Sequence, residues 1–174
     1  MKTKKAKKSS FKKKLKEKIK KESVYMITSH QKLYFQIINE MSKPFLNKGI
    51  TKIVSPEVKG LFYAPCIAYK LKLPFVTLLK KERLSRGDIS ESYKDYSKTK
   101  KILGIGKNTI KKGEKILLVD DIFESGKSGK ASIKLIEKTG AKIKGISIIY
   151  NKLKKDDEGF FKKYDFNHLP NKLK

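Results

Sequence analysis

The sequence predicts an α/β fold: one domain built on a doubly wound, mostly parallel sheet flanked by helices. Short apolar runs that suit buried strands alternate with segments whose apolar residues recur at helical spacing. With 174 residues the chain is large enough for one domain with a substantial core. The apolar run at 116–119 leads directly into two carboxylates, and open α/β sheets bind their ligands at such strand ends.

The first 21 residues are strongly basic. We expect residues 1–8, MKTKKAKK, to form a disordered basic tail and residues 9–174 to form the domain. Phe11, Leu15 and Ile19 recur every four residues, which predicts a surface helix with one narrow apolar stripe. No run reaches the ~18 apolar residues of a membrane span, and no apolar signal segment follows the basic start. A cytoplasmic protein without membrane attachment is therefore expected.

Strands and helices are expected to alternate through the first half of the chain. The helix that starts near His30 should end at Asn47-Lys48-Gly49, because glycine is favoured just beyond a helix C-terminus. The expected elements are strands at 24–27, 50–54 and 75–79, and helices at 30–46 and 61–71.

Residues 80–101 are polar and interrupt this alternation. A long polar segment inside a compact α/β domain is typical of a lid over an active site. Tyr93 and Tyr96 predict a hairpin within it, with a tip near 97–100. Beyond it we expect a strand at 116–119, a helix that ends at Thr139-Gly140 and a strand at 143–150. The aromatic-rich stretch 151–174 has no assigned element.

The net charge of +27 would attract nucleic acid or an anionic membrane surface. Only Arg83 and Arg86 are arginines, however, whereas proteins that read nucleic acid rely on the bidentate guanidinium group. A compositional bias towards lysine on ordinary solvated faces explains the same charge. The single cysteine, Cys66, excludes a disulfide framework.

The segment 115–130, KILLVDDIFESGKSGK, carries the strongest functional pattern. Asp120 and Asp121 follow a buried apolar run, and carboxylates at a strand end can bind the hydroxyl groups of a sugar. The loop behind them opens a helix, so its backbone N–H groups can face an anion. Together they predict a sugar phosphate ligand. A nucleotide triphosphate loop does not fit, because the position five residues before Gly126 is Asp121 and not glycine.

These residues resemble the motif with which type I phosphoribosyltransferases bind 5-phosphoribosyl-1-pyrophosphate (PRPP). The matching stretch is ILLVDDIFESGKS. The resemblance implies that Asp120 and Asp121 hold the ribose 2′- and 3′-hydroxyls. It also implies that a loop wraps the 5′-phosphate, although its first residue is larger than the small one usual in the family. That loop consists of Glu124, Ser125, Gly126, Lys127 and Ser128.

The similarity extends to 55–81, which resembles the family's pyrophosphate loop with the helix and strand that follow. It implies that Glu57, Val58 and Lys59 grip the pyrophosphate, and that Lys80 and Arg83 neutralise it. The polar segment 80–101 would be the flexible lid over PRPP. The short segment before His30 implies that the hood over the base is abbreviated.

Within the purine branch, the chain looks most like xanthine phosphoribosyltransferases and then like adenine phosphoribosyltransferases. Lys152 occupies the position of a lysine that contacts the base in xanthine enzymes. Asp95 matches the lid position of a catalytic acid in adenine enzymes.

The resemblance implies a purine phosphoribosyltransferase of purine salvage. Such an enzyme joins xanthine, guanine, hypoxanthine or adenine to PRPP and releases a nucleoside 5′-monophosphate and pyrophosphate. Mg²⁺ is the expected cofactor, contacted by Asp120 or Asp121, and the expected state is a homodimer. Two alternatives stay open: a PRPP-sensing regulator on the same fold that binds nucleic acid through its basic surface, and a related enzyme with another base or no base specificity.

Overall fold

The computed structural model describes residues 24–94 and 98–169. The tail and the surface helix expected before residue 22 lie outside the described residues. The α-helices are α2 (Val24–Ser29), α3 (Gln31–Ser42), α4 (Ala64–Leu71), α5 (Lys127–Lys138) and α6 (Lys155–Phe161). Three short 3₁₀ helices are η1 (Lys43–Phe45), η2 (Lys59–Phe62) and η3 (Lys81–Arg83). The strands are β1 (Lys52–Pro56), β2 (Phe75–Lys80), β3 (Ile89–Lys94), β4 (Lys100–Ile105), β5 (Lys115–Phe123), β6 (Lys142–Asn151) and β7 (Asp165–His168).

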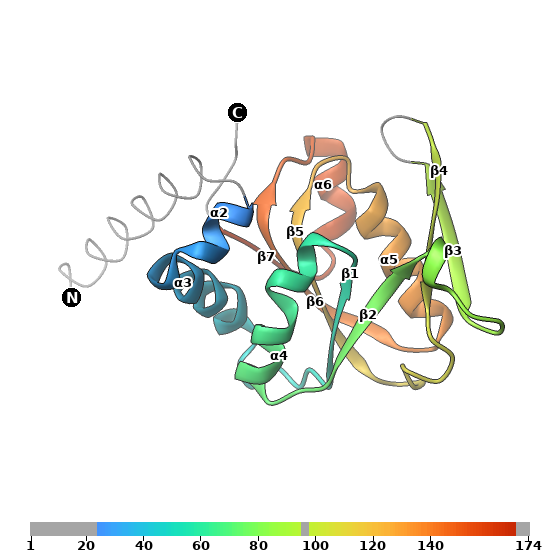
Figure 1. Ribbon diagram of the computed structural model, residues 1–174, viewed down its shortest axis with the longest axis horizontal. Helices are drawn as coiled ribbons and strands as arrows, with labels where there is room; N and C mark the ends of the chain where they lie inside the picture. Colours follow the sequence, from blue (N-terminus) through green and yellow to red (C-terminus); the bar gives the residue numbers. More distant parts are fainter. Residues whose placement is uncertain (1–23, 95–97, 170–174) are drawn as a thin grey trace.

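Within the described residues, seven strands form one sheet in the order β3-β4-β2-β1-β5-β6-β7. The neighbouring pairs from β2 across β1, β5 and β6 to β7 are parallel, whereas β4 is antiparallel to both β2 and β3. Figure 1 shows this antiparallel β3–β4 hairpin standing at one side of the molecule. The mostly parallel α/β sheet predicted from the sequence is confirmed.

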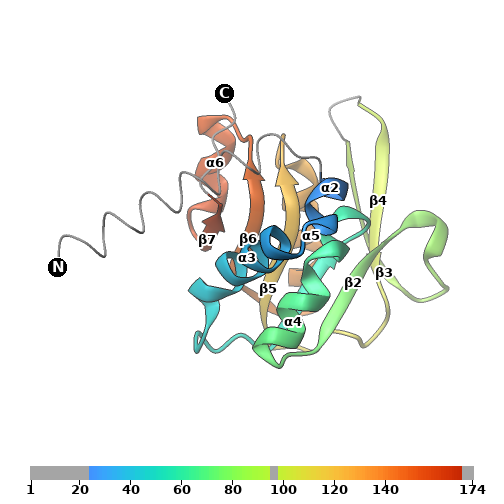
Figure 2. The same cartoon turned by 60° about the vertical axis from the view of Figure 1, so that its left-hand side comes forward.

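Helices cover both faces of the sheet, and successive side chains of β5 point to opposite faces. Leu117 and Val119 face a core shared with α2, α3 and α4, which lie in front of the sheet in Figure 2. Ile116 and Leu118 face a second core shared with α5 and with Phe161 of α6. Because both faces are covered, β5 reads in the sequence as a continuous apolar run.

Four sequence-based expectations need correction. Residues 24–27 form part of helix α2 and not a strand, because Ile27 packs fully buried beside α3. The helix expected to reach residue 46 ends at Ser42, since Pro44 lacks the N–H group that α3 would need. Strand β5 does not end at the acids but continues to Phe123. The stretch 151–174 does contain elements: helix α6 and the edge strand β7, which pairs with β6.

The polar segment expected to act as a lid forms the β3–β4 hairpin, whose strands pair from Ile89↔Ile105 to Lys94↔Lys100. The tip residues 95–97 lie outside the described residues. Of the helices in the described part of the chain, none combines the length and the apolar character that crossing a bilayer requires.

Candidate active site

A cleft of about 990 Å³ opens at the carboxyl ends of β1, β2 and β5 and is walled on one side by the β3–β4 hairpin. This is the edge at which open α/β sheets bind ligands. Seven residues that the sequence singled out line the cleft together, although they come from separate parts of the chain. They are Glu57, Val58, Lys59, Lys80, Asp120, Asp121 and Ser128.

Asp120 and Asp121 are buried within the carboxyl-terminal half of β5, with 7% and 5% of their surface exposed. The backbone N–H of Asp121 donates a 2.8 Å hydrogen bond to Oδ1 of Asp120. Burial raises the pKa of Asp120 well above its usual 3.8, and the neighbouring charge of Asp121 adds to the rise. Burial also raises the pKa of Asp121, against a hydrogen bond with Asp120 and the positive charge of Lys59. The pair is therefore suited to binding hydroxyl groups or a cation that would favour its ionised form.

The loop after β1 packs directly against this pair. A Cβ atom on Gly60 would lie 2.2 Å from Oγ of Ser55 and 3.1 Å from Oδ1 of Asp120, so only glycine fits there without movement. The peptide bond between Glu57 and Val58 in this loop is cis. Because Gly60 allows the close approach, Val58 and Lys59 reach the same cleft as the acids.

Glu57 lines the cleft, but its carboxylate is engaged by the end of β2. It accepts a 3.1 Å hydrogen bond from the backbone N–H of Lys80 and lies 3.4 Å from Nη1 of Arg83. The Glu57 side chain is 6% exposed and that of Arg83 is 71% exposed. Glu57 therefore fixes the strand end that carries Lys80, whereas Arg83 does not line the cleft.

The predicted phosphate loop connects β5 to α5. Gly126 has a positive φ of 68° and directly precedes the helix, and its carbonyl accepts the N–H of Lys130. Of the five predicted loop residues, Ser128 lines the cleft, whereas Glu124, Ser125, Gly126 and Lys127 do not. Glu124 is exposed.

Of the two remaining predicted residues, one is described and does not lie in the cleft. Lys152 follows β6 with an exposed side chain, and its backbone N–H binds the carbonyl of Phe123. It is absent from the cleft lining. Asp95 lies outside the described residues.

The sequence did not single out the individual cleft residues of η3 and the hairpin. Polar ones are Lys81, Glu82, Tyr93, Thr99, Lys100 and Lys101, and apolar ones are Ile102 and Leu103; Ile122 of β5 also lines the cleft. The lid prediction covered most of this segment. Which of its residues face the cleft depends on the antiparallel pairing of β4 with β2, and no local pattern reveals that pairing.

Within the described residues, no group of three or more His, Cys, Asp or Glu side chains could hold a metal ion alone. Mg²⁺ usually takes only one or two protein carboxylates and completes its shell with water and substrate phosphates. The buried oxygen pair of Asp120 and Asp121 fits that requirement.

Comparisons with known proteins agree on one family. A family model described as a phosphoribosyl transferase domain matches residues 23–170. The adenine phosphoribosyltransferase of Actinobacillus succinogenes is 32% identical over 126 residues, covering 72% of this chain and 69% of that protein. The one from Clostridium botulinum (strain Hall) is 33% identical over 132 residues, 76% of each chain.

Solved structures match in the same way. The adenine phosphoribosyltransferase of Thermoanaerobacter pseudethanolicus superposes with a TM-score of 0.76 at 24% identity, covering 83% of this chain and 84% of that one. The enzyme from Saccharomyces cerevisiae, solved in a complex that includes adenine, has a TM-score of 0.65 at 25% identity over the same shares. These relatives do not support the expectation that the chain is most like xanthine enzymes.

Proposed function

The chain belongs to the phosphoribosyl transferase domain family, and from this premise we propose that it is a purine phosphoribosyltransferase whose base is adenine. The proposed reaction joins adenine to PRPP and yields AMP and pyrophosphate. The observation that carries the proposal is the cleft in which the buried acids of β5 meet the loop after β1 and the end of β2. The choice of adenine rests on the relatives named above, which are adenine phosphoribosyltransferases.

The acids and the cations of the cleft have separate roles in this proposal. Asp120 and Asp121 accept hydrogen bonds from the ribose 2′- and 3′-hydroxyls, and a charged acceptor makes such bonds strong. Lys59 at the start of η2 and Lys80 at the end of β2 line the cleft, where they would bind pyrophosphate and stabilise its charge as it leaves. Ser128, which lines the cleft, would bind the 5′-phosphate with its hydroxyl group.

The transition state of this substitution carries positive charge on the ribose, so the protein's work is to position two reactants and to stabilise charge. The hairpin supplies Tyr93 and Lys100 to the cleft wall, which helps to exclude water from PRPP. Mg²⁺, when bound, would neutralise pyrophosphate oxygens, with Asp120 or Asp121 as its protein contacts.

A turnover assay tests the proposal. The full-length protein is incubated with PRPP, Mg²⁺ and one purine base at a time, and the nucleoside monophosphate is measured. We expect AMP from adenine, with little product from xanthine, guanine or hypoxanthine. Turnover of xanthine in place of adenine would overturn the base assignment. No turnover with any base, together with PRPP-sensitive binding to nucleic acid, would overturn the enzymatic function and favour a regulator.

A further inference from the structure

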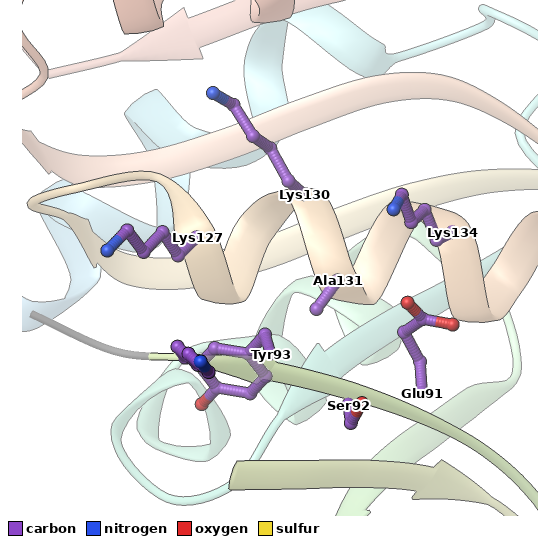
Figure 3. Close-up of a pocket in the computed structure, with 8 residues that line it drawn as sticks. Glu91, Ser92, Tyr93, Lys127, Lys130, Ala131 and Lys134 are labelled. Atoms are coloured by element: carbon purple, nitrogen blue, oxygen red, sulfur yellow. The ribbon is translucent and has the colours of Figure 1, made fainter. Parts of the chain in front are cut away.

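A second cavity, of about 350 Å³, lies between strand β3 and helix α5. Figure 3 shows Lys127 and Lys134 on the helix with Ala131 between them, facing Tyr93 and Glu91 on the strand. Lys94 and Lys130 also line the cavity. A volume of this size suits a small molecule.

The helix wall of this cavity follows from the helical repeat. Lys127, Ala131 and Lys134 are spaced by four and three residues, so they share one face of α5. Ala131 between the two lysines is buried in the apolar cluster against which Tyr93 packs, and it forms the apolar floor of the cavity. A ligand could therefore lie along the helix with a cation near each end.

The acids near the cavity already have partners. Glu91 forms a 2.6 Å ion pair with Lys138, and Asp157 of α6 forms a 2.8 Å ion pair with Lys130. Lys134 stands four residues from each of these paired lysines and forms no ion pair within the described part of the chain. Like charges at this spacing destabilise a helix. The cavity is thus a concentration of positive charge that an anion would relieve.

The cavity lies between two elements, β3 and α5, that contact each other directly elsewhere along their length. Near Ser90, the hairpin is attached to α5 by Lys138, whose ammonium donates a 3.0 Å hydrogen bond to the Ser90 carbonyl and pairs with Glu91. Further along β3, Tyr93 and Lys94 line the cavity opposite the helix. Tyr93 lines both this cavity and the main cleft, so an occupant here would contact a residue of the proposed PRPP site.

We propose that this cavity is a second anion site, which binds a small phosphorylated molecule between the α5 lysines and Lys94 and so ties β3 to α5. The site lies beside the main cleft, with which it shares Tyr93, and its existence does not depend on which base the protein uses. Its ligand class follows from the clustered ammonium groups, which bind phosphate as point charges.

The first test measures binding of inorganic tripolyphosphate by isothermal titration calorimetry at fixed salt. Lys94→Glu and Lys134→Glu should each weaken binding about tenfold, as expected for the loss of a charge-assisted contact. Lys134→Gln, which removes the charge without reversing it, should weaken binding by a smaller factor. Lys134 and Lys94 are both exposed, and glutamate at 134 would pair with Lys130 and Lys138, so folding should be retained.

The matched control is Lys144→Glu, which makes the same charge change at an exposed position of β6 away from both cavities. We expect it to change tripolyphosphate binding less than about twofold, because a distant surface charge is screened by salt. An equal loss in Lys144→Glu would show that the affinity comes from net charge alone and would overturn the site. Unchanged binding in Lys94→Glu and Lys134→Glu would overturn it as well.

A second readout locates the anion. Tripolyphosphate should slow amide hydrogen exchange in 89–94, because the ligand would hold β3 against α5. If Lys80→Ala abolishes binding while Lys134→Glu does not, the anion occupies the main cleft and the proposal fails. The site and the proposed function fail separately: a protein that makes no AMP could still show the predicted tripolyphosphate pattern.

Discussion

The backbone N–H of Asp121 donates a 2.8 Å hydrogen bond to Oδ1 of Asp120, so each of the two neighbouring acids helps to fix the other. Both are buried, and both have a raised pKa. A raised folded-state pKa means that the folded protein holds a proton more tightly than the unfolded chain. Stability therefore falls as the pH rises from the usual 3.8 through the folded-state value. At neutral pH the burial of this pair therefore costs stability.

From this cost follows the first prediction. Asp120→Asn combined with Asp121→Asn should raise the midpoint of thermal unfolding at neutral pH by a few degrees, because two buried ionisable groups are replaced by neutral ones. The same variant should lose about a hundredfold or more in PRPP affinity, measured by calorimetry, since two charged acceptors are lost. Asp165→Asn, an exposed change on β7, is the control for both measurements. A destabilised variant, or one that retains full affinity, would contradict this account of the acid pair.

The second prediction concerns the contact between Glu57 and Arg83. Glu57→Gln keeps an acceptor for the Lys80 N–H but loses the charge that faces the guanidinium group. We expect KM for PRPP to rise about threefold to tenfold with a smaller change in kcat, because the end of β2 would be held less firmly. Arg83→Gln should have a similar effect, and the double variant should be no worse than either single one. Fully additive effects would show that the two residues act independently.

Gly60 provides a third prediction, through the space beside Ser55 and Asp120. Gly60→Ala should destabilise the protein by about 1–3 kcal/mol in urea unfolding, because its Cβ would overlap the Ser55 hydroxyl. Adding Ser55→Ala should restore part of the loss and leave the contact with Asp120. Gly159→Ala is the control: it lies in helix α6 with nothing within 4 Å, and should stabilise by about 0.5–1 kcal/mol. A tolerated Gly60→Ala would mean that the loop can move away from the acids.

Lys52 gives a prediction for the opposite end of β1. Its ammonium donates to the Glu114 carboxylate at 2.8 Å and to the Thr109 carbonyl at 2.7 Å, and the residue is 8% exposed. Burial alone would raise the pKa of Glu114, but the hydrogen bonds and charges of Lys52 and Lys111 outweigh it, and the pKa lies below 4.5. Lys52→Met should therefore cost about 1–3 kcal/mol at neutral pH.

The pH dependence of that loss is a further check. Because the folded-state pKa of Glu114 is lowered, the pair stabilises the protein above pH 4.5, and this contribution disappears as the pH falls through the folded-state value. The difference in unfolding free energy between wild type and Lys52→Met should thus shrink on acidification. A difference that stays constant would mean that Lys52 acts through packing alone.

The sequence predicted the central part of the fold well. Strands β1, β2, β5 and β6 are apolar because both faces of the sheet are covered. Their continuous apolar runs in the sequence therefore predicted them. The hairpin was predicted from its polarity and its tyrosines. Helix α2 and strand β7 were missed because each is short, and their structure depends on packing beside α3 and β6.

The candidate site likewise has residues that the sequence predicted correctly and residues that it did not. The acids, the loop after β1 and Lys80 lie near the carboxyl ends of parallel strands, and these ends meet at one edge of the sheet. Arg83 and Lys152 were placed by analogy, and the structure does not bring either of them to the cleft. The role of Glu57 in holding the Lys80 backbone could not be predicted, because it depends on the distance between two strands that pair only in the folded sheet.

Parallel pairing of β1 with β5 sets Val54 beside Leu118 across a long stretch of intervening chain. Such pairing is slow, because closing the large loop between the two strands costs conformational entropy before any contact between them forms. During synthesis the loop after β1 therefore emerges well before the acids that complete the cleft. A ligand of the cleft could favour only chains in which both strands have already paired, and it would act as a late stabiliser of newly made protein.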